Sequence, residues 1–193
     1  AGVAPLDRVV LQLPNAPGFV FTYLALVRIG AIPVATTNHG KGAIDEGNPL
    51  SLGVFGNCMG SGSRTMHLRQ YATEADLVLL IGTRTAANGT ANWTLLPRDA
   101  QYIHIDIDGL EVGRNYEAFR LVGDAKLTVS ALLSQLSGAD FPDRATRHAC
   151  IAADNAKAQA QSQAVLHEIG AGRQGAVRPE HLMQVLDAQL RPQ

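Results

Sequence analysis

The feature that most constrains the fold is the stretch of residues 76–82, DLVLLIG, which is apolar at almost every position. A strand with one solvated face alternates apolar and polar residues, whereas a strand covered on both faces reads as a nearly continuous apolar run. Such strands belong to parallel sheets, whose strands are joined by crossover helices. This stretch therefore predicts an α/β fold with a parallel sheet.

The first forty residues contain a complete β-α-β pattern. Residues 7–13 (DRVVLQL) are β-branched and apolar, a turn PNAPG follows, and residues 19–29 carry apolar side chains at helical spacing. Asn15 suits the helix N-cap and Gly30 its end, before a second strand at residues 32–37. One right-handed β-α-β unit is thus expected by residue 37.

Strands and helices alternate through the next hundred residues. We expect a long irregular loop at 38–63, a helix at 64–74, strands at 76–82, 102–107 and 119–122, and an amphipathic helix at 125–136 with Leu127, Leu132, Leu133 and Leu136 on its buried side. Units of about thirty residues favour a Rossmann-like, doubly wound parallel sheet of about five to six strands.

The composition changes after residue 137. Residues 139–147 are polar and loop-like, residues 149–169 form an Ala/Gln-rich helix, and Pro179 opens an amphipathic helix near the chain end. We expect a Rossmann-like domain at 1–137, a helical linker at 138–176 and, at 177–193, the first part of a following domain. The fold is thus α/β with a C-terminal helical extension.

Charge and cysteine content exclude several classes of partner. The net charge of -1 gives no electrostatic reason to expect nucleic acid or an anionic membrane. The most apolar run is interrupted and too short to span a bilayer. Cys58 and Cys150 lie far apart, without C-x-x-C spacing, which fits a reducing cytoplasm and predicts no metal site.

Candidate binding residues follow the predicted strands, at the sheet edge where doubly wound folds bind ligands. They are Thr37, Gly82, Arg84, Asp106, Gly123 and Asp124. Glycine permits close backbone approach, arginine can clamp a phosphate, and a carboxylate can accept hydrogen bonds from ribose or adenine. The set is coherent for an adenine nucleotide. Glycines that only end strands, and aspartates that only cap helices, are the structural alternative.

Two loops argue against a standard phosphate cradle. The first strand-to-helix turn reads LPNAPG, with two prolines that lack N–H donors, where a Rossmann domain places its glycine fingerprint. The loop TTNHGKG at 36–42 has glycine beside lysine but not the P-loop spacing.

Several segments in order resemble the central domain of thiamine-diphosphate-dependent enzymes of the acetolactate synthase, benzoylformate decarboxylase and oxalyl-CoA decarboxylase type. They are IPVATT, GKGAIDEGNPLSLGVFG, EADLVLLIGTRT, IHIDIDGLEVGRN and LVGDAKLTVSALLSQL, from Ile32 to about Leu136. The segment VRPEHLMQVLDAQL resembles the entry into the diphosphate-binding domain of these enzymes.

The resemblance implies a central domain that binds FAD in acetolactate synthases, ADP in oxalyl-CoA decarboxylases, and often nothing elsewhere. Thr37, Gly82, Arg84, Asp106, Asn115, Gly123 and Asp124 match positions that would line its groove. No catalytic residue is expected here, because the family holds thiamine diphosphate and magnesium between flanking domains, where its activating glutamate and G-D-G…N motif belong. The loop TTNHGKG would then be part of the rim of the groove.

The start of the chain resembles a different family. Residues 1–35 carry the DRV strand, LPN and GAIPV of the N-terminal part of adenylate-forming aryl-acid ligases, without the ligase's ATP loop. The hypothesis is a chimera, natural or engineered, joined at IPV.

The functional expectation is the isolated central domain of an acetolactate synthase-like enzyme, without the catalytic domains, inactive by itself and with a vestigial FAD or ADP groove. The parent enzyme would carry out decarboxylation of 2-keto acids and carboligation. The rivals are a structural or assembly domain without a ligand, and a working FAD or ADP module. We expect a homo-oligomer, or contacts with flanking domains.

Overall fold

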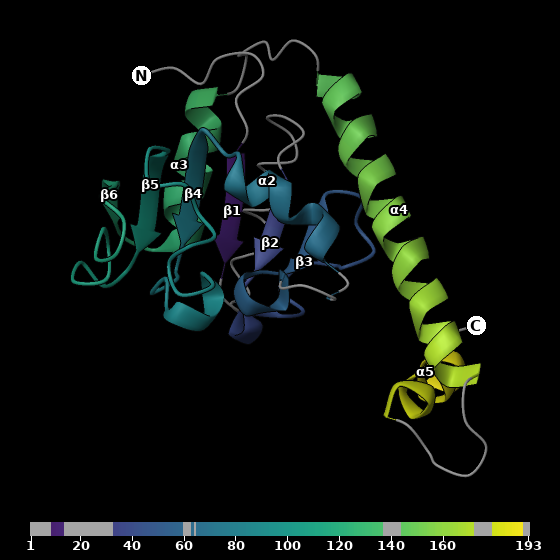
Figure 1. The fold of residues 1–193 in the computed structure, drawn as a ribbon. Coiled ribbons are helices and arrows are strands. Elements are labelled where there is room, and N and C mark those ends of the chain that lie inside the picture. Colours follow the sequence, from purple (N-terminus) through teal and green to yellow (C-terminus); the bar gives the residue numbers. More distant parts are fainter. Residues whose placement is uncertain are drawn as a thin grey trace.

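A computed structural model describes residues 9–13, 33–59, 63, 65–136, 144–171 and 179–190. Its centre is a six-stranded sheet in the order β3-β2-β1-β4-β5-β6, in which all neighbouring strands are parallel (Figure 1). The strands are β1 (Val9–Leu13), β2 (Val34–Thr36), β3 (Ser51–Val54), β4 (Leu77–Ile81), β5 (Gln101–Asp106) and β6 (Phe119–Val122). The predicted Rossmann-like fold class is confirmed.

Strand β3 corrects the predicted long loop at 38–63. It has only four residues, and Gly53 within it adopts a φ of +73°. Its pairing with β2 shifts register between Val34 and Thr36. A short strand with an internal glycine carries little periodicity, so the sequence pattern did not indicate it. The helix predicted at 19–29 lies outside the described residues.

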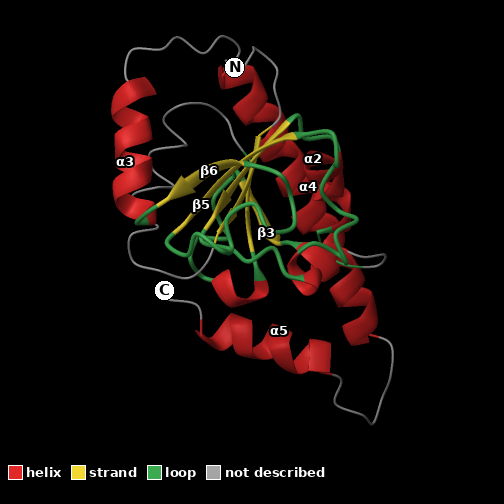
Figure 2. Cartoon of the chain, turned by 90° about the vertical axis from the view of Figure 1, so that its left-hand side faces the viewer, coloured by secondary structure: helices red, strands yellow, loops and turns green. Residues whose placement is uncertain are grey.

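Two apolar layers cover the sheet, as the continuous apolar reading of residues 76–82 requires. Along β4, Val78 and Leu80 pack in one layer, whereas Leu79 and Ile81 pack in the other. Figure 2 shows the sheet nearly edge-on, with helix α3 on one side and helices α2 and α4 on the other. Burial on both faces explains why β4 has no polar positions.

Helix α3 (Ala125–Leu136) has the predicted bounds. Val129 is its buried residue, and Leu132 and Leu133 pack against the core beside it. The prediction was wrong for Leu127 and Leu136, which are exposed. The predicted helix at 64–74 is a 3-10 turn, η3 (Met66–Leu68), continued by α2 (Arg69–Thr73).

Two helices follow the sheet. Helix α4 (Arg144–Ala171) includes residues 144–147, which were wrongly predicted as loop, and α5 (Pro179–Leu190) begins at the predicted proline. Ile151 of α4 packs on Leu50, and the Asn155 side chain donates to the Pro49 carbonyl at 2.6 Å. In Figure 1, α4 runs beside the β3 edge and reaches α5. No described helix is long and apolar enough to cross a membrane.

Candidate functional site

The strand order creates a topological switch point between β1 and β4. From β1 the chain builds toward β3 on one side and then from β4 toward β6 on the other. In open parallel sheets, ligands bind in the crevice at the carboxyl ends of the strands beside such a switch. The turn after β1, with its two prolines, lies outside the described residues.

Three predicted residues lie in one row at this edge. The register pairs Ile81 with Ile105 and Asp106 with Val122, so Gly82, Asp106 and Gly123 end three neighbouring strands together. The Gly82 N–H donates to the Ile105 carbonyl at 2.7 Å, and the Gly123 N–H donates to the Asp106 carbonyl at 2.9 Å. Both N–H groups therefore serve the sheet, and the glycines can offer close approach rather than hydrogen bonds.

Arg84 is exposed and lies three residues beyond Ile81, the last residue of β4. Its backbone is fixed by Asn115, whose amide nitrogen donates to the Arg84 carbonyl at 3.0 Å and to Thr85 Oγ1 at 2.9 Å. The Asn115 amide group thus ties the connection after β4 to the connection after β5. Asn115 positions Arg84, in addition to any contact it makes with a ligand.

The connection after β4 is held in an uncommon conformation. Thr85, Ala91, Asn92 and Trp93 have φ values between +48° and +59°, in the left-handed region that side chains other than glycine rarely adopt. The Trp93 indole N–H donates to the Thr85 carbonyl at 2.9 Å, and Thr90 Oγ1 accepts from the Trp93 N–H at 3.1 Å. The backbone next to Arg84 is therefore constrained from both sides.

Three predicted side chains already have local partners. Thr37 Oγ1 accepts from the Gly40 N–H at 3.1 Å and caps the 3-10 turn η1 (Asn38–Gly40). Asp106 Oδ1 accepts from the Asp108 N–H at 2.9 Å, and Asp124 Oδ1 accepts from the Leu127 N–H at 2.9 Å at the start of α3. Thr37 follows β2, so β1 separates it from the row at β4. These contacts are what the structural alternative expects.

His104 is a structural residue of this edge. Its imidazole is buried in β5, with Nε2 3.0 Å from the Thr83 carbonyl and Nδ1 accepting from the Gly113 N–H at 3.0 Å. Both nitrogens are satisfied by the neutral tautomer protonated at Nε2. Burial lowers the pKa of His104 below its ordinary value, against weaker opposing effects from Thr83, Asp106 and Glu111.

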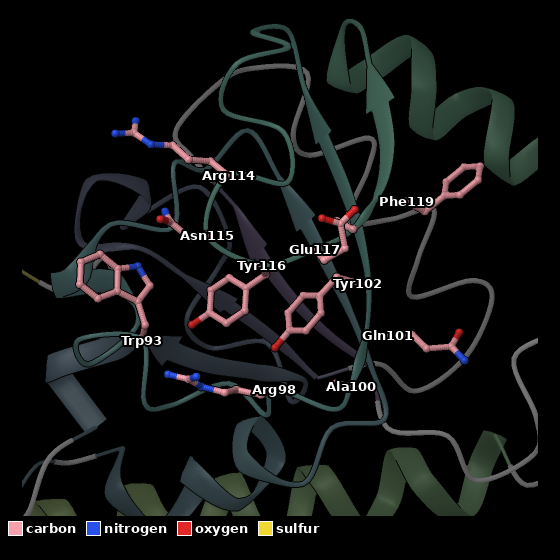
Figure 3. A pocket seen from close by; sticks show the side chains of 11 residues that line it. Trp93, Arg98, Ala100, Gln101, Tyr102, Arg114, Asn115, Tyr116, Glu117 and Phe119 are labelled. Carbon is pink, nitrogen blue, oxygen red and sulfur yellow. The ribbon is translucent and has the colours of Figure 1, made fainter.

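A pocket of about 930 Å³ lies at the amino-terminal ends of β5 and β6, since Gln101 and Phe119, the first residues of these strands, line it (Figure 3). It shares Asn115 with the candidate site, but none of the three residues of the row lines it. The rings of Tyr102 and Tyr116 stack at its centre with centroids 4.8 Å apart, and burial raises the pKa of both hydroxyls. In Figure 3 the Arg98 guanidinium lies on the hydroxyl side of the two rings, whereas Arg114 points away. The other residues that line the pocket include Trp93, Gln101, Asn115, Glu117 and Phe119. Nothing in the sequence pattern indicated this pocket.

The loop at 36–42 does not form a phosphate cradle in the structure. The Lys41 ammonium forms an ion pair with the Glu46 carboxylate. Lys41 and Glu46 line a second hollow, of about 470 Å³, between β3 and α4. Within the described residues, no group of three or more His, Cys, Asp or Glu side chains could hold a metal ion.

The sequence matches the family described as thiamine pyrophosphate enzyme, central domain, over residues 22–132. It is 38% identical over 124 residues to the probable acetolactate synthase large subunit of Methanocaldococcus jannaschii, covering 64% of this chain and 20% of the relative. It is 36% identical over 110 residues to the acetolactate synthase large subunit of Cyanidium caldarium, covering 54% and 17%. The chain spans about a fifth of the length of these relatives. The ligase-like reading of residues 1–35 stays a prediction.

Proposed function

The chain belongs to the family of thiamine pyrophosphate enzyme central domains, and on that premise we propose that it binds the ADP moiety of FAD, or ADP itself, at the carboxyl ends of β4, β5 and β6. The enzyme it would serve is acetolactate synthase-like and decarboxylates a 2-keto acid, with carboligation as a further step. Homo-oligomers or flanking domains would complete such an enzyme.

The observation that carries this proposal is the row of Gly82, Asp106 and Gly123 beside Arg84. The Arg84 guanidinium can form paired hydrogen bonds with a diphosphate. The Asp106 carboxylate can accept from a ribose hydroxyl or an adenine amine. The two glycines leave room for the ligand to approach the strand ends.

The fixed backbone around Arg84 supports the same role. Asn115 and Trp93 hold Thr85 from two sides, so the arginine extends from a rigid position although its side chain is exposed. A preorganised donor loses less conformational entropy when it binds. Thr37, which follows β2, and Asp124, which follows β6, would contribute beyond the row itself.

Thiamine diphosphate and its magnesium ion supply the decarboxylation chemistry in this family. Within the described residues no acidic or histidine cluster suits such a metal, so the residues described do not fit that cofactor. No catalytic step is therefore assigned to them, and the part proposed for these residues is nucleotide binding and support.

A structural domain without a ligand is the second candidate. It is favoured by the hydrogen bonds that Thr37, Asp106 and Asp124 make with their own turns. It is also favoured by the Gly82 and Gly123 N–H groups, which donate within the sheet and leave few donors for a phosphate. In this case the edge would only terminate the strands.

Calorimetric titration with FAD and, separately, with ADP distinguishes the two candidates. Trp93 is the only tryptophan of the chain and bonds to Thr85 next to Arg84, so its fluorescence gives a second readout. We expect micromolar binding that weakens at least about tenfold, or 1.4 kcal/mol, in Arg84→Ala. Asp106→Asn should also weaken binding, because it removes the charge and keeps an oxygen that can accept from the Asp108 N–H.

Arg98→Ala is the matched control, since it removes the same charge from the neighbouring pocket. It should leave affinity unchanged. If neither nucleotide produces heat or a change in fluorescence, the result would favour the structural domain. Equal weakening by both arginine variants would move the site into the pocket.

A further inference from the structure

Strand β6 forms an edge of the sheet that no described element covers. It is the outermost described strand opposite β3, and in Figure 1 no described element lies beyond it. Two of its four side chains are large, apolar and exposed: Phe119 at 70% and Val122 at 61%. Natural proteins usually cover or charge such an edge, because its unpaired backbone groups can bind another strand.

The direction of the unpaired backbone groups follows from the pairing with β5. The Gly123 N–H donates to the Asp106 carbonyl, and backbone groups alternate direction along a strand. The polar groups of Phe119 and Leu121 therefore face β5. Those of Arg120 and Val122 point outward, away from the sheet.

The one charge on β6 does not protect this edge. The Arg120 side chain folds over Gly113, where a Cβ would come within 2.9 Å of Arg120 Nε. The side chain therefore lies along the connection between β5 and β6 and does not project beyond the strand. The glycine at 113, with a φ of +73°, makes room for it.

Exposed apolar side chains also follow β5 and β6 along the chain. Ile107 and Leu110, in the connection after β5, and Leu127 of α3 are also exposed, and a Cβ at Gly109 would lie 3.6 Å from the Val122 side chain. Phe119 and Val122 point to opposite faces of the sheet, so the exposed apolar surface lies on both sides of the strand. Together these side chains expose on the order of 600 Å² of apolar surface, at the upper end of what ordinary monomers expose and below the roughly 800 Å² that each partner buries in a standard interface.

We propose that two copies of this chain associate through β6, antiparallel, about a two-fold axis perpendicular to the sheet at Leu121. This arrangement joins two six-stranded sheets into one continuous sheet. The pairing satisfies outward backbone groups and brings the exposed apolar side chains on both faces of β6 next to the second copy in a closed, symmetric contact. It does not depend on nucleotide binding.

The register follows from the residues on the strand. With the axis at Leu121, Arg120 and Val122 of the second copy form a hydrogen-bonded pair, and Phe119 lies opposite Gly123 of the second copy, which has no side chain. An axis at Arg120 would place two arginines opposite each other, which is unfavourable. An axis at Val122 would require pairing with Asp124, which already caps α3. The net charge of -1 opposes association only weakly.

Sedimentation over a wide concentration range tests the surface. The wild-type chain should pass from monomer to dimer, and Val122→Lys should shift the dissociation constant at least tenfold upward. Met183→Lys is the matched control, because Met183 of α5 is 64% exposed and lies on another apolar surface. It should associate like the wild type. Circular dichroism confirms that both variants are folded.

The proposal is overturned if the wild-type chain stays monomeric at the highest concentration. It is equally overturned if Met183→Lys abolishes association while Val122→Lys does not, since α5 would then be the contact.

Cysteine cross-linking tests the register. In a Cys58→Ser/Cys150→Ser background, the double variant Arg120→Cys/Val122→Cys should form a covalent dimer on oxidation, because hydrogen-bonded cross-strand Cα atoms lie about 5.5 Å apart, within disulfide range. Neither single variant should cross-link, since identical positions would lie more than about 7 Å apart. A cross-link in either single variant would refute this register, and none in the double variant would refute the pairing.

Discussion

The two edges of the sheet differ in burial: helix α4 packs at the β3 edge, whereas side chains at the β6 edge are exposed. At the β3 edge, Ile151 of α4 is 1% exposed against Leu50, and Asn155 donates to the Pro49 carbonyl. At the β6 edge, Phe119 and Val122 remain exposed. Both edge strands have four residues, so strand length does not decide which is protected. The difference comes from a helix that is far from β3 in sequence.

Very few residues make the covered edge. Among the α4 side chains that the structure describes, the buried ones are Ile151, Asn155 and Ala158, a spacing of i, i+4 and i+7 that defines one helical face. Only one of the three is a large apolar residue. A helix with so narrow an apolar face resembles a linker in sequence. It nevertheless covers the β3 edge, because the buried polar residue Asn155 donates a hydrogen bond to the Pro49 carbonyl.

The largest effect is expected where the covered edge is broken. Ile151→Ala should lower the free energy of unfolding by about 2–5 kcal/mol, because it removes buried methylenes and leaves a cavity against Leu50. Val165→Ala, at an exposed position of the same helix, should change it by less than about 0.5 kcal/mol. Urea denaturation measures both. Equal costs would mean that α4 does not stabilise this edge.

The polar contact beside Ile151 should contribute less. The Tyr71 hydroxyl donates to Asp154 Oδ2 at 2.5 Å. Tyr71→Phe should cost about 1–3 kcal/mol, as expected for a hydrogen bond to a charged acceptor. A double-mutant cycle with Asp154→Ala isolates the pairwise energy. Purely additive costs would show that the two side chains act independently.

Much of the fold could be predicted from local pattern. Strand β4 follows from its continuous apolar run, and α3 follows from apolar spacing behind Asp124, its cap. Strand β3 could not be predicted, because Gly53 interrupts it and its register shifts against β2. The early start of α4 at Arg144 was missed because its first turn is polar.

In the candidate site, too, some features could be predicted from local sequence pattern and others could not. The row of Gly82, Asp106 and Gly123 was predictable, since parallel strands end at a common edge. The bonds from Asn115 and Trp93 to Thr85 were not, because they join connections whose geometry depends on left-handed residues without a glycine signal. The same holds for His104, whose partners lie in two different connections.

His104 makes the β6 half of the sheet sensitive to acid. Its pKa is lowered in the folded protein by burial, so below about pH 6.5 the unfolded chain binds more protons than the folded one. Stability should therefore be full above pH 6.5 and fall as the pH drops toward the folded pKa, by at most about 1.4 kcal/mol per pH unit for one proton. His104→Gln should lose this component, measured as the difference in unfolding free energy between pH 7.5 and pH 5.0. An unchanged pH dependence in the variant would assign the acid sensitivity to other groups.

The smallest effect on the monomer is expected at the β6 edge. Phe119→Thr removes an exposed ring and introduces a β-branched residue, which also suits a strand, so at low protein concentration it should change the free energy of unfolding by less than about 0.5 kcal/mol. At high concentration the wild-type chain gains apparent stability from association by mass action, and its Tm should rise with concentration, whereas that of the variant should stay nearly constant. Calorimetric melting at two concentrations separates these terms. A large loss in dilute solution would show that Phe119 stabilises the monomer itself, and the contrast between the two edges would then be one of degree.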